Sequence, residues 1–112
     1  MATITAEHVN SIFKNLPIAP SGNRVRVFCK DGFNVSVQAS QYHYSTPREA
    51  DASYYEEFEL GFPSEHLLEL EEWSEDTDCC GVFGYVPAEE LAKVFEAHGG
   101  VDFPAIMASA GK

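Results

Sequence analysis

Two runs of alternating apolar and polar residues lie on either side of Asp31 and Gly32, and their phase restricts how this chain can fold. A two-residue turn at these positions would place the apolar side chains of the two strands on opposite faces of a sheet. A three-residue loop, residues 30–32 with the glycine left-handed in a bulge, gives both strands one shared apolar face. The sequence therefore predicts a bulged hairpin with the pairs Cys29 with Phe33, Val27 with Val35 and Val25 with Val37.

An amphipathic helix is predicted before the hairpin, over residues 6–16. Its apolar residues recur with helical spacing from Val9 to Leu16, and Thr5 can cap its first turn. Residues 17–23 contain Pro, Ser, Gly and Asn, which favour turns. This segment is therefore predicted to connect the helix to the hairpin.

A long loop and a third strand are predicted after the hairpin. Residues 40–53 show no period and are expected to form a surface loop. Alternation resumes over residues 55–62 and predicts a strand with an acidic outer face. Its inner face is expected to hold Phe58, Leu60 and Phe62, and its outer face Tyr55, Glu57 and Glu59.

A short helix is predicted next, followed by an acidic loop. Ser64 can cap this helix, which is expected to end near Trp73. Its apolar stripe is expected to consist of Leu67, Leu68 and Leu70. Residues 74–81 have the composition of an acidic loop.

The C-terminal third predicts one more strand and one more helix. Residues 82–86 suit a buried fourth strand, and Pro87 suits the first turn of a helix that ends at His98. The inner stripe of this helix is predicted to be Leu91, Val94 and Phe95. The tail, residues 101–112, is rich in small residues and is expected to fray.

The element order α-β-β-β-α-β-α predicts the α+β class, because strands that are adjacent in sequence usually pair as antiparallel neighbours. We expect an antiparallel sheet of about four strands with helices packed on one face. A chain of 112 residues with 45% hydrophobic residues is long enough for one core and too apolar for a disordered acidic protein. Residues 1–112 are therefore predicted to form a single domain.

Composition also predicts the compartment. No stretch approaches the roughly 20 apolar residues that span a bilayer, and the first residues lack the pattern of a secretory signal. The three cysteines, two of them adjacent, do not suit a framework of paired disulfides. A soluble cytoplasmic protein is expected.

Charge is distributed very unevenly. Residues 49–92 carry fourteen Asp and Glu and no Lys or Arg, which accounts for the formal net charge of -11. The predicted outer face of the hairpin is basic and polar, with Arg24, Arg26 and Lys30 beside Asn34, Ser36 and Gln38. Such a protein should repel nucleic acid across its acidic part and attract basic surfaces.

Familiar catalytic and metal-binding motifs are not formed. Residues 76–81 begin like a calcium loop, but Pro87 stands where the closing Glu should be. The cysteines and histidines have no zinc-ligand spacing, and the glycines near residue 84 do not make a phosphate loop. A nucleophilic pair such as Cys80 with His43 or His98 stays open, because such partners meet in space and not in sequence.

Residues 41–48 are the best candidate for specific recognition. They contain Tyr42, His43, Tyr44 and Arg48, and aromatic and arginine side chains dominate many interfaces. The alternative is that the two tyrosines cover an edge of the sheet or the end of the core.

Three segments resemble short stretches of small accessory proteins of bacteriophages and prophages. They are SVQASQYHYSTPR at residues 36–48, GYVP at residues 84–87 and HGG at residues 98–100. Such small acidic phage proteins include inhibitors of bacterial defence systems, among them anti-CRISPR proteins, several of which present carboxylates where a nucleic-acid phosphate would lie. The resemblance implies this kind of protein, with no catalytic residues to transfer.

The sequence therefore favours a non-enzymatic binding protein with no cofactor and no metal. It is expected to dock an acidic face on the Lys/Arg-lined nucleic-acid channel of a host protein or nucleoprotein complex, without binding nucleic acid or membrane itself. The predicted partner-binding residues are Glu56, Glu57, Glu59, Glu69, Glu71, Glu72, Glu75, Asp76, Asp78, Tyr42, His43, Tyr44 and Arg48. The alternatives are a small metal- or Cys/His-dependent enzyme and a self-associating phage accessory protein that forms a homodimer.

Overall fold

The structure is a computed structural model that describes residues 4–65, 67–74 and 81–110. Its strands form one antiparallel sheet in the order β1-β2-β3-β4, which confirms the predicted α+β fold. An additional C-terminal helix follows the predicted elements. The elements are α1 (Ala6–Lys14), β1 (Val27–Phe28), β2 (Asn34–Gln38), β3 (Glu57–Gly61), the 3-10 helix η1 (Leu68–Trp73), β4 (Val82–Pro87), α2 (Ala88–Ala97) and α3 (Phe103–Ala110).

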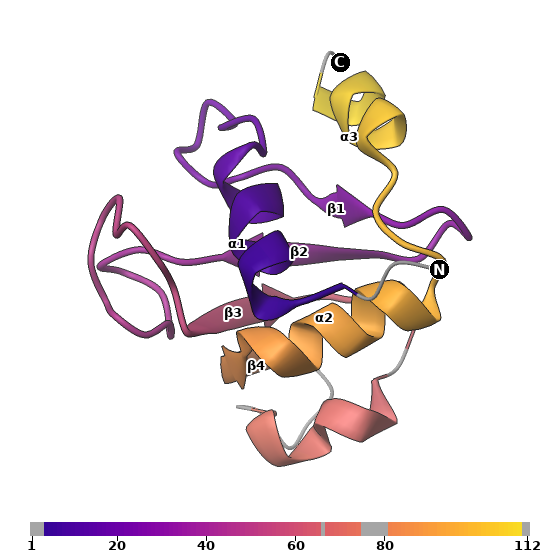
Figure 1. Ribbon diagram of the computed structural model, residues 1–112. Coiled ribbons are helices and arrows are strands. Elements are labelled where there is room, and N and C mark those ends of the chain that lie inside the picture. The colour runs from indigo at the N-terminus through magenta and orange to yellow at the C-terminus, as the bar shows by residue number, and fades with distance from the viewer. Residues whose placement is uncertain (1–3, 66, 75–80, 111–112) are drawn as a thin grey trace.

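The helices α1 and α2 pack against each other over one face of the sheet, as Figure 1 shows. Between them and the sheet lie the predicted inner residues of the strands and of α2, with the exception of Phe62. The side chains with at most 2% exposure include Val27, Val35, Val37, Phe58, Leu60, Val86, Leu91, Val94 and Phe95. We call the face of the sheet that points away from α1 and α2 the outer face.

Both edges of the sheet are covered by other segments of the chain. Beside β1, the amide of Lys30 donates to the carbonyl of Gly100, and the amide of Asp102 donates to the carbonyl of Phe28. Beside β4, Ser74 forms an isolated bridge with Phe83. Unpaired strand edges invite unwanted pairing with other chains, so this covering protects the sheet.

The predicted hairpin is confirmed in its turn and register. Val27 pairs with Val35, Gly32 has a left-handed φ of 98°, and the amide of Cys29 donates to the carbonyl of Phe33 over 2.8 Å. The predicted pair of Val25 with Val37 is not formed: the amide of Val25 donates to the carbonyl of Pro17, and the side chain of Gln38 bonds the backbone N–H and C=O of Arg24. Gln38 is consequently buried, although the alternation predicted it on the polar face.

The first helix begins as predicted, with Thr5 as its N-cap. The hydroxyl of Thr5 accepts from the amide of His8, and the His8 ring accepts from the amide of Thr5, which completes a capping box. The helix ends at Lys14, two residues before the predicted end, and Leu16 is still buried beyond it.

Two predicted orientations around β3 are wrong. Tyr55 was expected to face outward but is 2% exposed, because the side chain of Asn10 bonds both its N–H and its C=O and draws it beneath α1. Phe62 was expected to face inward but is 62% exposed. Its φ of 51° breaks the alternation of the strand, and its amide donates to the carbonyl of Gly81.

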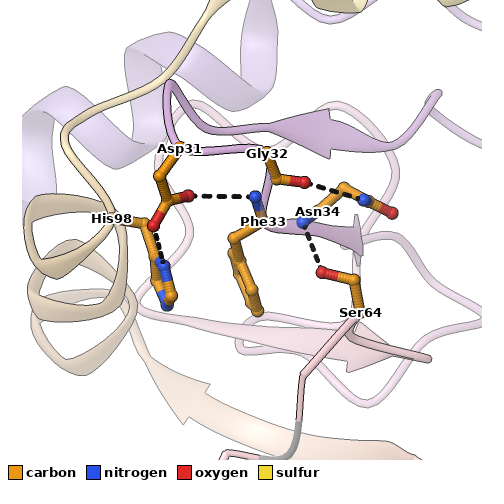
Figure 2. A network of polar contacts seen from close by, with 6 residues as sticks. All are labelled: Asp31, Gly32, Phe33, Asn34, Ser64 and His98. Atoms are coloured by element: carbon orange, nitrogen blue, oxygen red, sulfur yellow. Dashed lines mark hydrogen bonds and ion pairs between the residues drawn. The ribbon is translucent and has the colours of Figure 1, made fainter.

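The segment after β3 differs from the predicted helix in type and start. It is a 3-10 helix that begins at Leu68, and no side chain caps it. The hydroxyl of Ser64 instead accepts from the amide of Asn34, as Figure 2 shows. Leu67 and Leu70 are buried as predicted, whereas Leu68 is 72% exposed, and the end at Trp73 is confirmed.

The C-terminal segment is ordered as α3 and not frayed as expected. The side chain of Asp102 accepts from the amide of Ala105, which is the bond expected of an N-cap. Ile106 is fully buried, and α3 packs against β1. The burial of Ile106 and the bond from the amide of Asp102 to the carbonyl of Phe28 therefore join this segment to the sheet.

Candidate functional site

The predicted partner-binding residues that the structure describes do not form one surface. Glu57 and Glu59 are half-buried on the outer face of the sheet, and Glu56 is exposed at the start of β3. Glu69, Glu71 and Glu72 are exposed on η1. The remaining predicted acids lie outside the described residues, and these are Glu75, Asp76 and Asp78.

The long loop lies against β3 and β4 and brings Tyr44 beside Glu59. The amide of Tyr44 donates to the Glu59 carboxylate over 3.2 Å, and the carbonyl of Tyr44 accepts from the amide of Tyr85 over 2.9 Å. The rings of Tyr44 and Tyr85 stack with centroids 5.8 Å apart. The Arg48 guanidinium lies 5.7 Å from the centroid of the Tyr44 ring, so these side chains form one cluster.

Glu57 bonds the same loop at Thr46, two residues after Tyr44. The Thr46 hydroxyl donates to the Glu57 carboxylate over 2.6 Å, and the two residues also form a backbone bridge. Glu57 and Glu59 therefore fix the loop, which leaves less of their charge available to a partner than an exposed carboxylate would offer.

Tyr42 and His43 lie apart from the cluster at Glu59, in a separate hollow. Both line a hollow of about 570 Å³, together with Lys14 and Arg24. The His43 Nδ1 atom lies 2.7 Å from the Ser40 hydroxyl, and Tyr42 is 79% exposed. The predicted recognition loop is thus divided: Tyr44, with Arg48 over its ring, lies at Glu59 of β3, whereas Tyr42 and His43 line a hollow with Lys14 and Arg24.

A groove of about 1200 Å³ lies between α1, α2 and the start of β3. We call it the acidic groove, and its charged lining residues are Glu7, Glu56, Glu57, Glu89, Lys93 and Glu96. Lys93 is paired with Glu90 over 3.1 Å, so its charge is partly offset within α2. The groove therefore concentrates carboxylates from three elements in one concave surface.

Three carboxylates of the acidic groove were missing from the predicted site: Glu7, Glu89 and Glu96. The sequence does contain part of the signal, since Glu89, Lys93 and Glu96 recur at the spacing of one helix face. What it does not contain is the packing of α1 against α2, which places Glu7 on the facing wall.

A second polar cluster joins the hairpin turn to the end of α2, as Figure 2 shows. One carboxylate oxygen of Asp31 accepts from the amide of Phe33 over 2.9 Å, and the other lies 2.7 Å from His98 Nδ1. The Phe33 amide, followed by His98, holds the pKa of the Asp31 carboxyl below its usual range. The His98 ring also stacks on Phe33.

Cys29, which precedes this cluster in the chain, is not activated. Cys29 is 2% exposed, and burial, with a smaller contribution from the charge of Asp31, raises the pKa of its thiol to about 12. Such a thiol is a poor nucleophile and a poor metal ligand, because both roles need the thiolate. Cys79 and Cys80 lie outside the described residues.

Across the described ranges, no group of three or more His, Cys, Asp or Glu side chains is placed to hold a metal ion. Within the same ranges, no helix is long and apolar enough to cross a membrane. Comparison with models of known families, with curated proteins and with solved structures finds no match. Function is therefore inferred from the chain's own residues and geometry.

Proposed function

We propose that this protein is a non-enzymatic binding protein that docks a carboxylate-rich surface on a Lys/Arg-lined surface of a protein or nucleoprotein. The observation that carries the proposal is the exposure of the acids in a chain of net charge -11, on η1 and around the acidic groove. Exposed carboxylates of one sign attract a basic partner over several ångströms and accelerate its encounter.

The arginines of the hairpin support this proposal, because they bond main-chain oxygen atoms of their own molecule. Arg24 donates to the carbonyls of Lys14 and Leu16. Arg26 donates to the carbonyl of Phe62, and burial lowers the pKa of its guanidinium. Both guanidinium groups are therefore engaged by carbonyls, and the carboxylates of Glu7, Glu56 and Glu89 are exposed at the surface.

The cysteine and histidine side chains that the structure describes support a Cys/His-dependent enzyme less well than they support a binding protein. Cys29 has a raised thiol pKa, His98 is committed to Asp31 and Phe33, and His43 is hydrogen-bonded to Ser40. The burial of Cys29 and the contacts of His98 and His43 contribute to the stability of the fold. A binding role needs none of these groups to be reactive.

The resemblance to phage accessory proteins narrows the proposal to an inhibitor of a host nucleic-acid-binding defence complex, of the anti-CRISPR kind. The basic channel of such a complex binds phosphates, and carboxylates can occupy the same positions. This target places the protein in the cytoplasm of the host cell.

Affinity capture from a host lysate, followed by mass spectrometry and a binding assay with the purified partner, tests the proposal. We expect a basic, nucleic-acid-binding partner that is released as salt rises from about 0.05 M to about 0.5 M, because screening weakens charge pairing. A DNA or RNA duplex should compete with the protein for this partner. A partner that stays bound at high salt and ignores the duplex contradicts the proposal.

A homodimer is the second candidate, and one observation favours it. Arg26 and Glu59 lie on the same outer face of the sheet, Arg26 bonding Asn34 of β2 and Glu59 pairing with Gln38 in the ladder. Two copies related by a two-fold axis could bring the basic end of one face to the acidic end of the other. Light scattering at low and high salt tests this, since a dimer made by charge should dissociate as salt rises.

A further inference from the structure

The acidic groove has an apolar floor and charged walls. The floor favours an apolar side chain of a partner, and the walls favour positive charge. Its floor consists of small apolar side chains, because Ala88 and Ala92 of α2 end at Cβ and are each only 2% exposed. Around them lie partly exposed apolar groups of Ile4, Ala6 and Pro87. The partly exposed groups can contact an apolar side chain of a partner that lies over the two alanines.

The walls of the groove carry the charge. Glu7, Glu56 and Glu89 are all exposed, and each belongs to a different part of the fold. Among the lining residues that the structure describes, Lys93 is the only cation, and it is already paired with Glu90. The groove should therefore bind a positively charged ligand more tightly than a neutral or negatively charged one.

Two hydrogen bonds join the segments that form the walls of the groove. The amide of Ala88 donates to the carbonyl of Glu56 over 2.8 Å, which joins the start of α2 to the start of β3. The amide of Ile4 donates to the Glu96 carboxylate over 3.1 Å, which holds the segment before α1 alongside α2. The groove is thus preformed, and a partner does not need to order it on binding.

We infer that the acidic groove binds a segment of the partner that presents one bulky apolar side chain between Lys or Arg side chains. The inference rests on the proposed function, namely that the partner is basic, and it adds the place and the chemistry of the contact. The argument for this occupant is charge complementarity on the walls together with an apolar floor. A purely cationic chain would leave the floor unused, and an uncharged apolar segment would leave the carboxylates without a partner.

Two synthetic peptides serve as probes with the full-length protein. One carries Lys and Leu at helical spacing, and the other has Ser in place of Leu with the same length and charge. The Lys–Leu peptide is expected to bind at least about tenfold more tightly, which corresponds to the burial of one apolar side chain. NMR amide shifts should concentrate at Ala6, Ala92 and Lys93. Equal affinity for both peptides, or shifts centred on η1, overturns the inference.

Matched charge reversals separate the groove from the overall charge. Glu7→Lys with Glu89→Lys changes the groove, and Glu69→Lys with Glu72→Lys changes η1 by the same net charge. We expect the groove pair to weaken Lys–Leu binding at least about tenfold more than the η1 pair, because close charges act more strongly than screened distant ones.

The variants also distinguish failure of the inference from failure of the proposed function. If both reversals weaken binding equally, or only the η1 pair does, a basic partner still fits but the groove is not its site. If neither reversal changes binding, charge does not select the partner and both proposals fall. If light scattering without peptide shows a dimer that only the groove pair dissociates, the occupant is a second copy and the inference is overturned.

The groove reversals place Lys in the first turns of α1 and α2, where acids stabilise the helices. Glu7→Gln with Glu89→Gln, compared with Glu69→Gln with Glu72→Gln, avoids this effect and keeps the side-chain size. The groove pair of Gln variants is expected to show the larger loss of binding with an unchanged circular dichroism spectrum. A smaller loss than that of the η1 pair contradicts the inference.

Discussion

The imidazole of His98 lies flat on the ring of Phe33, with centroids 4.1 Å apart and planes 10° apart. This contact joins the C-terminal cap of α2 to the hairpin turn, and it places His98 Nδ1 within 2.7 Å of Asp31. His98 therefore joins two elements that are far apart in the sequence, beside the main-chain bond from Lys30 to Gly100.

Replacing His98 with Ala removes both the stack and the hydrogen bond. We expect a loss of about 1–2 kcal/mol in the free energy of unfolding, the usual range for an aromatic pair with one polar contact. His98→Phe keeps the stack and should fall between Ala and wild type. Urea denaturation at pH 7 measures all three proteins, and an unchanged midpoint for His98→Ala would show that the contact is dispensable.

Asp31 should make stability depend on acid pH. Its pKa is lowered in the folded protein, first by the Phe33 amide and then by His98, so the ionised form stabilises the fold. This contribution is fully present above the unfolded-state pKa of about 3.9 and is lost as pH falls through the lower folded-state pKa. Wild type should therefore exceed Asp31→Asn in urea midpoint at pH 7, and the difference should shrink below about pH 4. A constant difference from pH 7 to pH 2.5, roughly the span of the carboxyl titration, contradicts this.

The hairpin could be predicted because its determinants are local. The phase of the two apolar runs and the position of Gly32 admit one register, and Val27 does pair with Val35. The caps and stripes of α1 and α2 are local in the same sense. Each depends on residues within about two helical turns of one another.

Tyr55 and Phe62 were misplaced because long-range contacts override the alternation. Asn10, from a different element, bonds the backbone of Tyr55, and Gly81 accepts from the amide of Phe62. Prediction of the candidate site was limited by long-range contacts in the same way. The stripe on α2 is visible in the sequence, but only the packing of α1 against α2 brings Glu7 to face it.

Asn10 is expected to be the most sensitive polar residue of the core. Its amide group donates to the carbonyl of Tyr55 over 2.9 Å and accepts from the amide of Tyr55 over 2.6 Å, at a site where Asn10 is 4% exposed. Asn10→Ala would leave both backbone groups buried without a partner, so we expect a loss of about 2–4 kcal/mol. The control is Asn15→Ala, which removes one exposed bond to Ser11 and should cost less than about 1 kcal/mol. Equal losses in thermal or urea unfolding would contradict the role given to Asn10.

Cys29 should resist thiol reagents while the protein is folded. Burial raises the pKa of its thiol to about 12, so at pH 8 the thiolate fraction is about 10⁻⁴, against roughly a quarter for an unperturbed cysteine. In a Cys79→Ser, Cys80→Ser variant, a disulfide reagent should label the native protein about 10³-fold more slowly than the urea-unfolded protein, since only the thiolate reacts. The unfolded sample also controls for reagent quality. Rapid native labelling at pH 8 would show that Cys29 is accessible and ionised, and would return a cysteine-dependent chemistry to consideration.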